Sequence, residues 1–362
     1  MRLILGVETS CDETSVAVLR GCEELALVTR ANLEGQAEYG GVVPEIAARQ
    51  HIAAIGPVYE QALAVAHISS ADLEAVAVTY GPGLAGSLIV GLNFARGLAT
   101  GLGVPLLAVN HLEAHVLASW IGRAATEPPE LPAVCLVVSG GHTDLTVMRT
   151  ECRHELLGRT RDDAAGEAFD KVARVLELGF PGGPAIQQAA AALPDGAEKP
   201  YALPRAWLRD TYDFSFSGVK TAVYRAWVDK LGPAEEQRIF RDEGGARLQR
   251  RDPVAIARMA AGFQAAVVDV LVHKTVAAAE EFAAASVILA GGVAANLALR
   301  EALVARLDIP LFLPEIRHCM DNGAMVAMAG AQLLERGQLA PDDLDIDPGL
   351  ELTALEVARP GN

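Results

Sequence analysis

Two histidines four residues apart, His111 and His115 in the segment NHLEAH, have a spacing that suits a shared metal ion. Residues at i and i+4 lie on one face of a helix, so both imidazoles would point the same way. In the HExxH protease motif a Glu follows the first histidine directly and acts as general base. Here Leu112 takes that place and Glu113 comes one residue later. Two histidines on a polar helix face would have the same spacing, so the pair alone does not distinguish a metal site from a solvated surface.

A carboxylate far along the chain is the candidate third ligand. Asp321 opens the segment DNGAMVAMAG, at the start of an expected helix over 323–336. Asp is also a common helix N-cap, and from position alone that role is the more frequent one. The two roles do not exclude each other. Two imidazoles and one carboxylate with open coordination positions suit Fe(II) or Zn(II).

Glycine-rich turns follow expected strands in both halves of the chain: GPGLAG (81–86), SGGH (139–142) and AGGVAAN (290–296), while PGGP (181–184) joins two expected helices. Glycine lets backbone amides approach a ligand closely, and amides at a helix N-terminus favour phosphate. A tight turn alone would equally explain Gly81 and Gly83. Together the turns indicate a nucleotide held between two lobes. The pattern GxxxxGK[ST] does not occur, so a P-loop is not supported.

Three acidic residues lie beside these turns. Asp12 and Glu13 fall in the polar turn between the first two expected strands. Asp170 falls in the helical segment AGEAFDKVARVL, where a solvated charge beside Lys171 and Arg174 is the alternative that the sequence alone favours.

The elements that must position these residues form two α/β halves. Short apolar runs predict strands at 3–7, 14–19, 25–29, 75–79, 106–109, 133–138, 145–149 and 287–289. The segment YGGVVPEIAARQH (39–51) is expected to open a helix that runs to about 66. Further helices are expected at about 87–102, 164–178, 184–193, 217–230, 253–284 and 323–336, and after the turns at 110 and 296. Each half begins with a strand, a polar or glycine turn, and another strand, which indicates a repeated topology.

Length and turns suggest the boundaries of the lobes. The expected N-terminal lobe spans 1–125 and is completed by the helix at 323–336, and the C-terminal lobe spans 126–322. The charged stretch 233–252 is expected to be an insertion, and 337–362 a poorly structured tail.

Composition limits the class of protein. The net charge of −16 argues against holding nucleic acid by bulk charge alone. Five cysteines lie scattered without a C-x-x-C pair, which fits a reducing cytoplasm. No uncharged apolar run reaches membrane-spanning length, so we expect a soluble protein without a membrane partner.

With these segments in view, the chain resembles the bacterial tRNA N6-adenosine threonylcarbamoyltransferases, the TsaD family, formerly labelled glycoproteases. The matching segments occur in order from residue 3 to about 330: ETSCDET, YGGVVPE, GPGLAGSL, NHLEAH, VSGGHT, DDAAGEAFDKVAR, FPGGP, DFSFSGVKT, LAGGVAAN and DNGAMVA. Small departures are Met320 where Thr is common and Asp144 where Gln is common. Archaeal and eukaryotic relatives place a Tyr near the metal in the strand before SGG, where this chain has Val, which leaves a fourth ligand position to water or substrate.

The resemblance implies a two-lobe actin-like, sugar-kinase (ASKHA) fold with a ligand cleft between the lobes. It implies transfer of a threonylcarbamoyl group from threonylcarbamoyl-AMP to N6 of adenosine 37, in tRNAs that read ANN codons (t6A modification). The metal-ligand positions fall on His111, His115 and Asp321, with Fe(II) the expected metal and Zn(II) the alternative. The adenylate positions fall on Val137, Val138, Ser139, Gly140, Gly141, Asp170, Gly183 and Asn296.

The same resemblance implies partners. In bacteria the family works with a TsaB-like inactive paralogue and a TsaE-like ATPase, and a synthase supplies threonylcarbamoyl-AMP. The acidic balance predicts that tRNA binding needs such help. Asp12 or Glu13 is the candidate to accept the N6 proton. Two alternatives stay open: a kinase of the same fold, and a metalloprotease, which the place of Glu113 disfavours.

Overall fold

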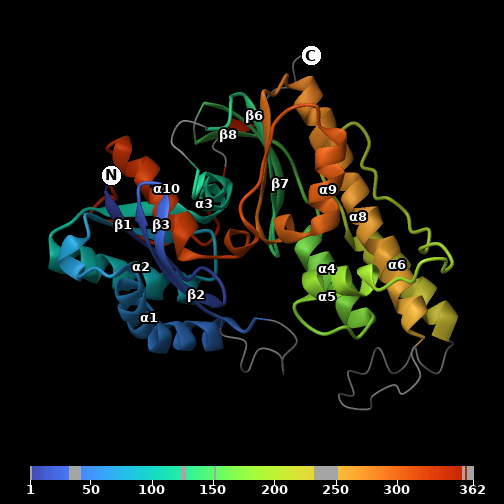
Figure 1. The fold of residues 1–362 in the computed structure, drawn as a ribbon, viewed down its shortest axis with the longest axis horizontal. Helices are drawn as coiled ribbons and strands as arrows, with labels where there is room; N and C mark the ends of the chain where they lie inside the picture. The colour runs from blue at the N-terminus through green and yellow to red at the C-terminus, as the bar shows by residue number, and fades with distance from the viewer. Residues whose placement is uncertain are drawn as a thin grey trace.

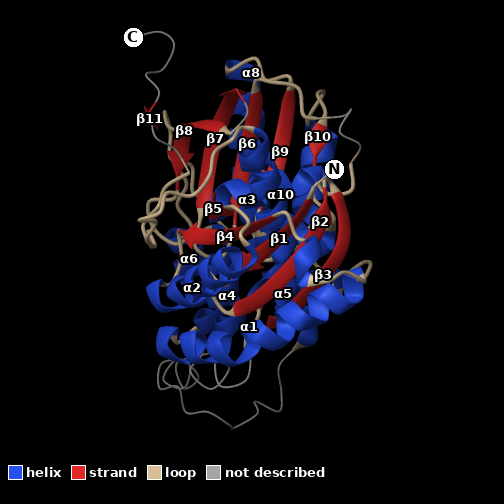
Figure 2. Ribbon diagram, turned by 90° about the vertical axis from the view of Figure 1, so that its left-hand side faces the viewer, coloured by secondary structure: helices blue, strands red, loops and turns tan. Residues whose placement is uncertain are grey.

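The computed structural model describes residues 2–31, 42–123, 128–150, 152–231, 252–352 and 355–356. Its strands form two separate sheets, each with its own helices (Figure 1). Figure 2 shows the strands of the second sheet above those of the first. The expected insertion at 233–252 lies outside the described residues except for Asp252, whose side chain caps the following helix.

The first sheet has the order β3-β2-β1-β4-β5. Its strands are β1 (Leu3–Glu8), β2 (Glu13–Arg20), β3 (Glu23–Ala31), β4 (Ala75–Gly81) and β5 (Leu106–Asn110). β1, β2 and β3 pair antiparallel, whereas β4 and β5 continue from β1 in parallel. A parallel core needs helices on both faces, and its strands therefore read as nearly continuous apolar runs.

Alternate residues of these strands enter two different cores. Leu5, Val7 and Val76 pack against α1 (Pro44–Ala66) and α2 (Ala85–Leu102). Ile4 and Ala77 pack on the opposite face against α10 (Gly323–Glu335) and α3 (His111–Leu117). α10 follows the helices of the second lobe in sequence, yet it lies within the N-terminal lobe (Figure 1).

The second sheet has the order β10-β9-β6-β7-β8-β11. Its strands are β6 (Ala133–Val138), β7 (Thr143–Thr150), β8 (Arg153–Arg159), β9 (Ser286–Ala290), β10 (Leu311–Phe312) and β11 (Leu355–Glu356). Its helices are α4 (Ala165–Val175), α5 (Gly182–Ala191), α6 (Ser217–Leu231), α8 (Pro253–Glu281) and α9 (Leu297–Arg306). Short 3₁₀ turns are η1 (Ser70–Asp72), η2 (Ala118–Trp120), η3 (Gly292–Ala295) and η4 (Ile316–His318).

α3 lies between the two sheets. Its Ala114 and Leu117 enter the core of the N-terminal lobe. Its Leu112 and Val116 instead pack against one face of the second sheet, where Val137 of β6 belongs to the same cluster. The helix that carries both histidines is therefore buried between lobes.

α8 is the one described helix that is long and apolar enough to cross a membrane by length and composition. Most of its apolar window is buried inside the protein, with Phe263, Val267 and Leu271 in the core of the C-terminal lobe. These are the properties of a core helix.

The described C-terminal residues 337–352 contain no helix or strand, but they pack against the N-terminal lobe. Leu344 and Ile346 join the core beneath α1 and α2. The backbone N–H of Asp347 donates to the carbonyl of Tyr80 at 2.8 Å.

At Glu351 the same segment contacts both lobes. The carbonyl of Glu351 accepts from Asn110 Nδ2 of β5, in the N-terminal lobe, at 2.9 Å. Its carboxylate pairs with Arg159 Nη1 of β8 at 2.7 Å. The expectation of a poorly structured tail therefore does not describe 337–352, which follow an irregular but well-contacted path.

Candidate metal centre

The local fold at the end of β5 turns both histidines in one direction. Asn110 ends the strand, and its Oδ1 caps α3 by accepting from the N–H groups of Leu112 at 2.9 Å and Glu113 at 3.3 Å. The imidazole rings of His111 and His115 then lie edge to face, with centroids 4.7 Å apart. The predicted shared face is confirmed.

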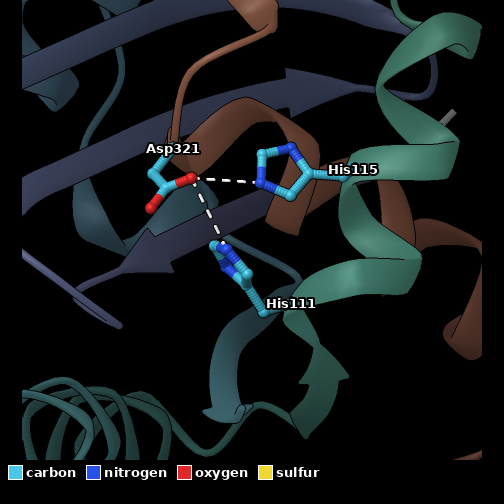
Figure 3. A group of neighbouring side chains, drawn as sticks. All are labelled: His111, His115 and Asp321. Carbon is cyan, nitrogen blue, oxygen red and sulfur yellow. Dashed lines mark hydrogen bonds and ion pairs between the residues drawn. The ribbon is translucent and has the colours of Figure 1, made fainter. Parts of the chain in front are cut away.

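Asp321 brings a carboxylate to the same place (Figure 3). Its Oδ1 lies 3.0 Å from His115 Nε2 and 3.5 Å from His111 Nε2. The cap of α10 is a different residue, because Asn322 Oδ1 accepts from Met325 N at 2.9 Å. The alternative reading of Asp321 as an N-cap is therefore wrong.

The charges of these three groups depend on one another. Burial acts to raise the pKa of Asp321, but the His111 and His115 imidazoles outweigh it and hold that pKa far below its usual range. Burial acts to lower the pKa of His111, but Asp321 and Glu8 raise it well above the ordinary value. Without a metal, protons on imidazole supply the positive charge that the carboxylates need.

The donor set fits a divalent transition metal. The ligand atoms of His111, His115 and Asp321 all lie within 4.8 Å of one another. Two imidazole nitrogens and one carboxylate oxygen suit iron or zinc, and three protein ligands leave coordination positions open. A cation among them would also take the place of the imidazole protons, since metal ligands must be deprotonated.

Glu8 is a residue of this site that the sequence analysis missed. Its fully buried carboxylate lies 3.0 Å from His111 Nδ1, on the side of the ring away from Asp321. Burial acts to raise its pKa, and the charge of His111 outweighs that effect and lowers it. The available signal was a charge at the end of the apolar strand LILGVE, because unpaired carboxylates are almost never fully buried.

Comparison with known proteins identifies the family. The model of the TsaD family, tRNA N6-adenosine threonylcarbamoyltransferase, matches residues 24–328. A tRNA N6-adenosine threonylcarbamoyltransferase of Thermomicrobium roseum is 49% identical, covering 99% of both chains. One of Geobacillus kaustophilus is 46% identical over 96% of both. The chain belongs to the tRNA N6-adenosine threonylcarbamoyltransferase family.

Solved structures support the fold. Full-length HypF superimposes with a TM-score of 0.57 at 14% identity, covering 94% of this chain and 56% of that chain. Component A of the Acidaminococcus fermentans (R)-2-hydroxyglutaryl-CoA dehydratase gives a TM-score of 0.50 at 14% identity, covering 92% and 98%. At this identity the likeness concerns the fold alone, and the predicted two-lobe actin-like fold is confirmed.

Family membership makes the protein an acyl-type transferase that acts on tRNA and forms t6A. It favours this activity over the kinase and metalloprotease alternatives.

The SGGH turn leaves space above the sheet. Val137 and Val138 are buried in β6, and Ser139 closes the turn by bonding both the carbonyl and the N–H of His142. A methyl group added at Gly140 or Gly141 would meet no described atom within 4 Å.

The C-terminal lobe contributes three further positions. Asp170 Oδ1 accepts from Gly182 N at 2.7 Å, so it faces the N-terminus of α5 and is not the solvated helix charge that its sequence neighbours suggested. Gly183, the next residue, has open space around its Cα among the described atoms. Asn296 caps α9 through Leu299 N, and its amide nitrogen donates to Gln264.

Asp12 directly precedes β2, and Glu13 is the first residue of that strand. Burial, followed by the charges of Asp321 and Asp12, raises the pKa of Glu13 to about 9. Glu13 therefore holds its own proton at neutral pH in the metal-free protein. Burial raises the pKa of Asp170, and the charges of Glu167 and Asp12 add smaller contributions in the same direction.

Gly81 and Gly83 of GPGLAG allow a close approach between backbone segments. A Cβ at Gly81 would lie 2.0 Å from the carbonyl oxygen of Asp347, and one at Gly83 would lie 2.6 Å from that of Ser10. Leu84 N also donates to Ser10 O at 2.8 Å. These contacts favour the tight-turn alternative, in which this turn supports the loop after β1.

The described cavity of about 580 Å³ does not include the metal ligands. Its lining includes Asn110, Glu113, Asp347 and Glu351. Glu113 lies two residues from each histidine and so points from the opposite face of α3. The geometry of the donor atoms, and not this cavity, therefore locates the candidate site.

Proposed function

We propose that the protein transfers the threonylcarbamoyl group from threonylcarbamoyl-AMP to N6 of adenosine 37 in tRNAs reading ANN codons, using one divalent metal held by His111, His115 and Asp321. The observation that carries this proposal is the convergence of three ligand atoms from α3 and the segment before α10, within 4.8 Å of one another. The family of the chain supports the reaction type.

Fe(II) is the metal that we propose, with Zn(II) as the alternative. A set of two histidines and one carboxylate with open positions is typical of non-haem Fe(II), while Zn(II) accepts the same donors. When bound, such a metal supplies Lewis-acid polarisation and a template for the donor.

The adenylate of the donor would lie between the SGGH turn and the N-terminus of α5. Gly140, Gly141 and Gly183 offer space close to backbone amides, which favour phosphate. The carboxylate of Asp170, at the N-terminus of α5, would lie close enough to this position to accept a hydrogen bond from the ribose or from an N–H group of the donor. The HypF structure of the same fold is described as phosphate- and nucleotide-bound, which supports a nucleotide site in this fold.

The reaction requires mainly that the enzyme position the two substrates and stabilise the charge that develops during transfer. The N6 amine attacks the carbamoyl carbon, the bond from that carbon to the phosphate oxygen breaks, and AMP leaves. The amine is a weak nucleophile and must lose a proton. We assign this proton to Asp12 and not to Glu13, because burial and the neighbouring carboxylates raise the pKa of Glu13 to about 9 in the metal-free protein.

The partners that we propose are a TsaB-like paralogue and a TsaE-like ATPase, in the cytoplasm. The net charge of −16 supports a need for help, because protein–RNA affinity rests largely on cationic contacts to phosphate. Such partners would supply part of the surface that holds tRNA.

The test is a reconstituted reaction. The protein is incubated with threonylcarbamoyl-AMP, tRNA and the partner proteins, and the digested nucleosides are analysed by mass spectrometry for t6A. We expect t6A from the wild type and none above background from His111→Ala or Asp321→Ala, while metal analysis shows loss of the bound ion. Circular dichroism checks that the variants fold.

A matched control is His154→Ala, which removes another buried histidine far from the three ligands in sequence and bonded to Thr146. It is expected to lower stability while leaving the bound metal in place. Full activity of His111→Ala, or of wild-type protein after chelation and removal of metal, would contradict the metal role. Absence of t6A in every combination would contradict the reaction.

A further inference from the structure

Glu8 lies at the end of β1 and makes three contacts inside the protein. Its side chain is fully buried. Oε1 accepts from the backbone N–H of Ser10 at 2.5 Å, and Oε2 accepts from Thr79 Oγ1 at 2.6 Å. Oε2 also lies 3.0 Å from His111 Nδ1.

The direction of the contact with His111 follows from what each atom can do. An ionised carboxylate has only acceptor sites, so the hydrogen between Oε2 and Nδ1 must belong to the imidazole. Ser10 Oγ, 3.2 Å from the same nitrogen, can accept as well. With the proton on Nδ1, the neutral ring keeps a lone pair on Nε2, the atom that faces Asp321.

The other histidine has no equivalent partner. His115 is fully buried, and its Nδ1 has no hydrogen-bond partner among the described residues. Its Nε2 also faces Asp321. The orientation of His115 therefore rests on the packing of α3, whereas that of His111 rests on a charged hydrogen bond from a different strand.

We propose that Glu8 is a positioning residue, which holds His111 in the Nδ1–H tautomer and so presents Nε2 to the metal. The proposal rests on the metal centre of the proposed function. A carboxylate behind a ligating imidazole also raises the basicity of the ligand, and loss of such a partner typically weakens metal affinity 10- to 100-fold.

Thr79 and Ser10 give the arrangement its rigidity. Because both Glu8 oxygens accept from groups on fixed backbone, β4 and the turn after β1 hold the carboxylate in place. The oxygen of a neutral amide at position 8 could still accept from Nδ1 and from Thr79, but its NH₂ group would then meet the backbone N–H of Ser10, which is also a donor. We therefore expect Glu8→Gln to weaken the orientation without emptying the space.

The test compares Glu8→Gln with Glu113→Gln. Glu113 also carries a partly buried carboxyl group, and burial raises its pKa. It lies on α3 itself, but on the face away from the ligand nitrogens. Affinity for Zn(II) and Fe(II) is measured by competition with a chelator of known affinity. We expect a loss of 10- to 100-fold for Glu8→Gln and less than about threefold for Glu113→Gln.

A second readout does not involve metal. Protein labelled with ¹⁵N-histidine, stripped of metal, gives ring-nitrogen signals for its eight histidines, and His111→Ala assigns those of His111. At a pH where the ring is neutral, we expect the wild type to show the proton on Nδ1, and Glu8→Gln to show a mixture of tautomers. Glu8→Asp, which keeps the charge but shortens the reach, tests the same contact if Glu8→Gln does not fold.

The outcomes separate this proposal from the one on which it rests. Equal metal affinity of wild type and Glu8→Gln, or an Nε2–H tautomer in the wild type, overturns the role of Glu8 and leaves the metal centre standing. A wild type that binds neither metal overturns the metal centre, and the role of Glu8 with it.

Discussion

Glu24 and His318 join the two lobes through a partly buried hydrogen bond of 2.5 Å between Glu24 Oε2 and His318 Nε2. Glu24 belongs to β3, whereas His318 lies in η4, three residues before Asp321. Arg317 adds a second contact to the same carboxylate at 2.6 Å. The segment that carries the third metal ligand is thus attached to the N-terminal sheet before it reaches α10.

Loss of this carboxylate should cost stability. We expect Glu24→Ala to lower the free energy of unfolding by about 2–3 kcal/mol, because it leaves the buried His318 without its acceptor. The neighbouring residue supplies the control, since Glu23 is exposed and lies 4.0 Å from Arg20. Glu23→Ala should change stability by less than about 0.5 kcal/mol in urea unfolding. Equal losses from the two variants would contradict the role of Glu24.

The same pair should show in the pH dependence of stability. Burial acts to raise the pKa of Glu24, but His318 and Arg317 outweigh it, and the pKa is lowered from its ordinary 4.5. A carboxylate with a lowered pKa stabilises the fold above its unfolded value and loses that contribution as the pH falls. The difference in unfolding free energy between wild type and Glu24→Gln should therefore shrink as the pH falls below about 4.5. A difference that grows below that pH would contradict this assignment.

Two adjacent glycines should separate substrate binding from folding. A methyl group at Gly183 meets no described atom within 4 Å, so Gly183→Ala should leave thermal stability unchanged. If the adenylate lies against it, the KM for threonylcarbamoyl-AMP should rise roughly tenfold.

The contrasting variant is Gly182→Ala, in which the new Cβ would lie 2.5 Å from the Cα of Asp170. It should lower the melting temperature, because backbone atoms cannot move aside as a flexible side chain can. An unchanged KM in Gly183→Ala would place the donor elsewhere.

The contact between β1 and α10 should be sensitive to a single methyl group. A Cβ at Gly6 would lie 2.1 Å from the carbonyl oxygen of Gly323, so we expect Gly6→Ala to destabilise by about 3 kcal/mol or more. Gly97, exposed on α2, has no described atom within 4 Å of an added Cβ. Gly97→Ala should stabilise by about 0.5–1 kcal/mol through helix propensity. Denaturant unfolding of both variants measures the contrast.

The C-terminal segment should contribute to stability although it lacks regular structure. Ile346 packs beneath α1 and α2, whereas Leu339, earlier in the same segment, is exposed. We expect Ile346→Ala to lower the unfolding free energy by roughly 1–2 kcal/mol, less than for a fully buried isoleucine. Leu339→Ala should change it by less than about 0.5 kcal/mol. If both variants have the same unfolding free energy as the wild type, residues 337–352 do not pack stably against the N-terminal lobe in solution.

The sequence predicted local features well because they depend on near neighbours. Spacing alone placed His111 and His115 on one helix face, and apolar runs located the main strands. β8 was missed because its sequence RHELLGR mixes charged and apolar residues and is only partly buried. β10 was missed because it has only two residues.

Residues whose role depends on distant partners were harder to assign. Asp170 looked like a surface charge, since nothing nearby in sequence shows that the N-terminus of α5 will meet it. Glu8 was passed over because its partners, Thr79 and His111, lie 71 and 103 residues away. The path of 337–352 depends on distant partners such as Tyr80 and Arg159, and its few apolar side chains follow no regular period.

The place of α10 has a consequence for how the chain is made. Its residues are translated after the helices of the C-terminal lobe, yet its Ala327 and Met328 fill the core of the first sheet beside Ile4. While the protein emerges from the ribosome, part of one face of the first sheet therefore stays uncovered until α10 has been synthesised. Asp321, two residues before that helix, arrives with it, so the newborn chain gains its third metal ligand only when the lobe is closed.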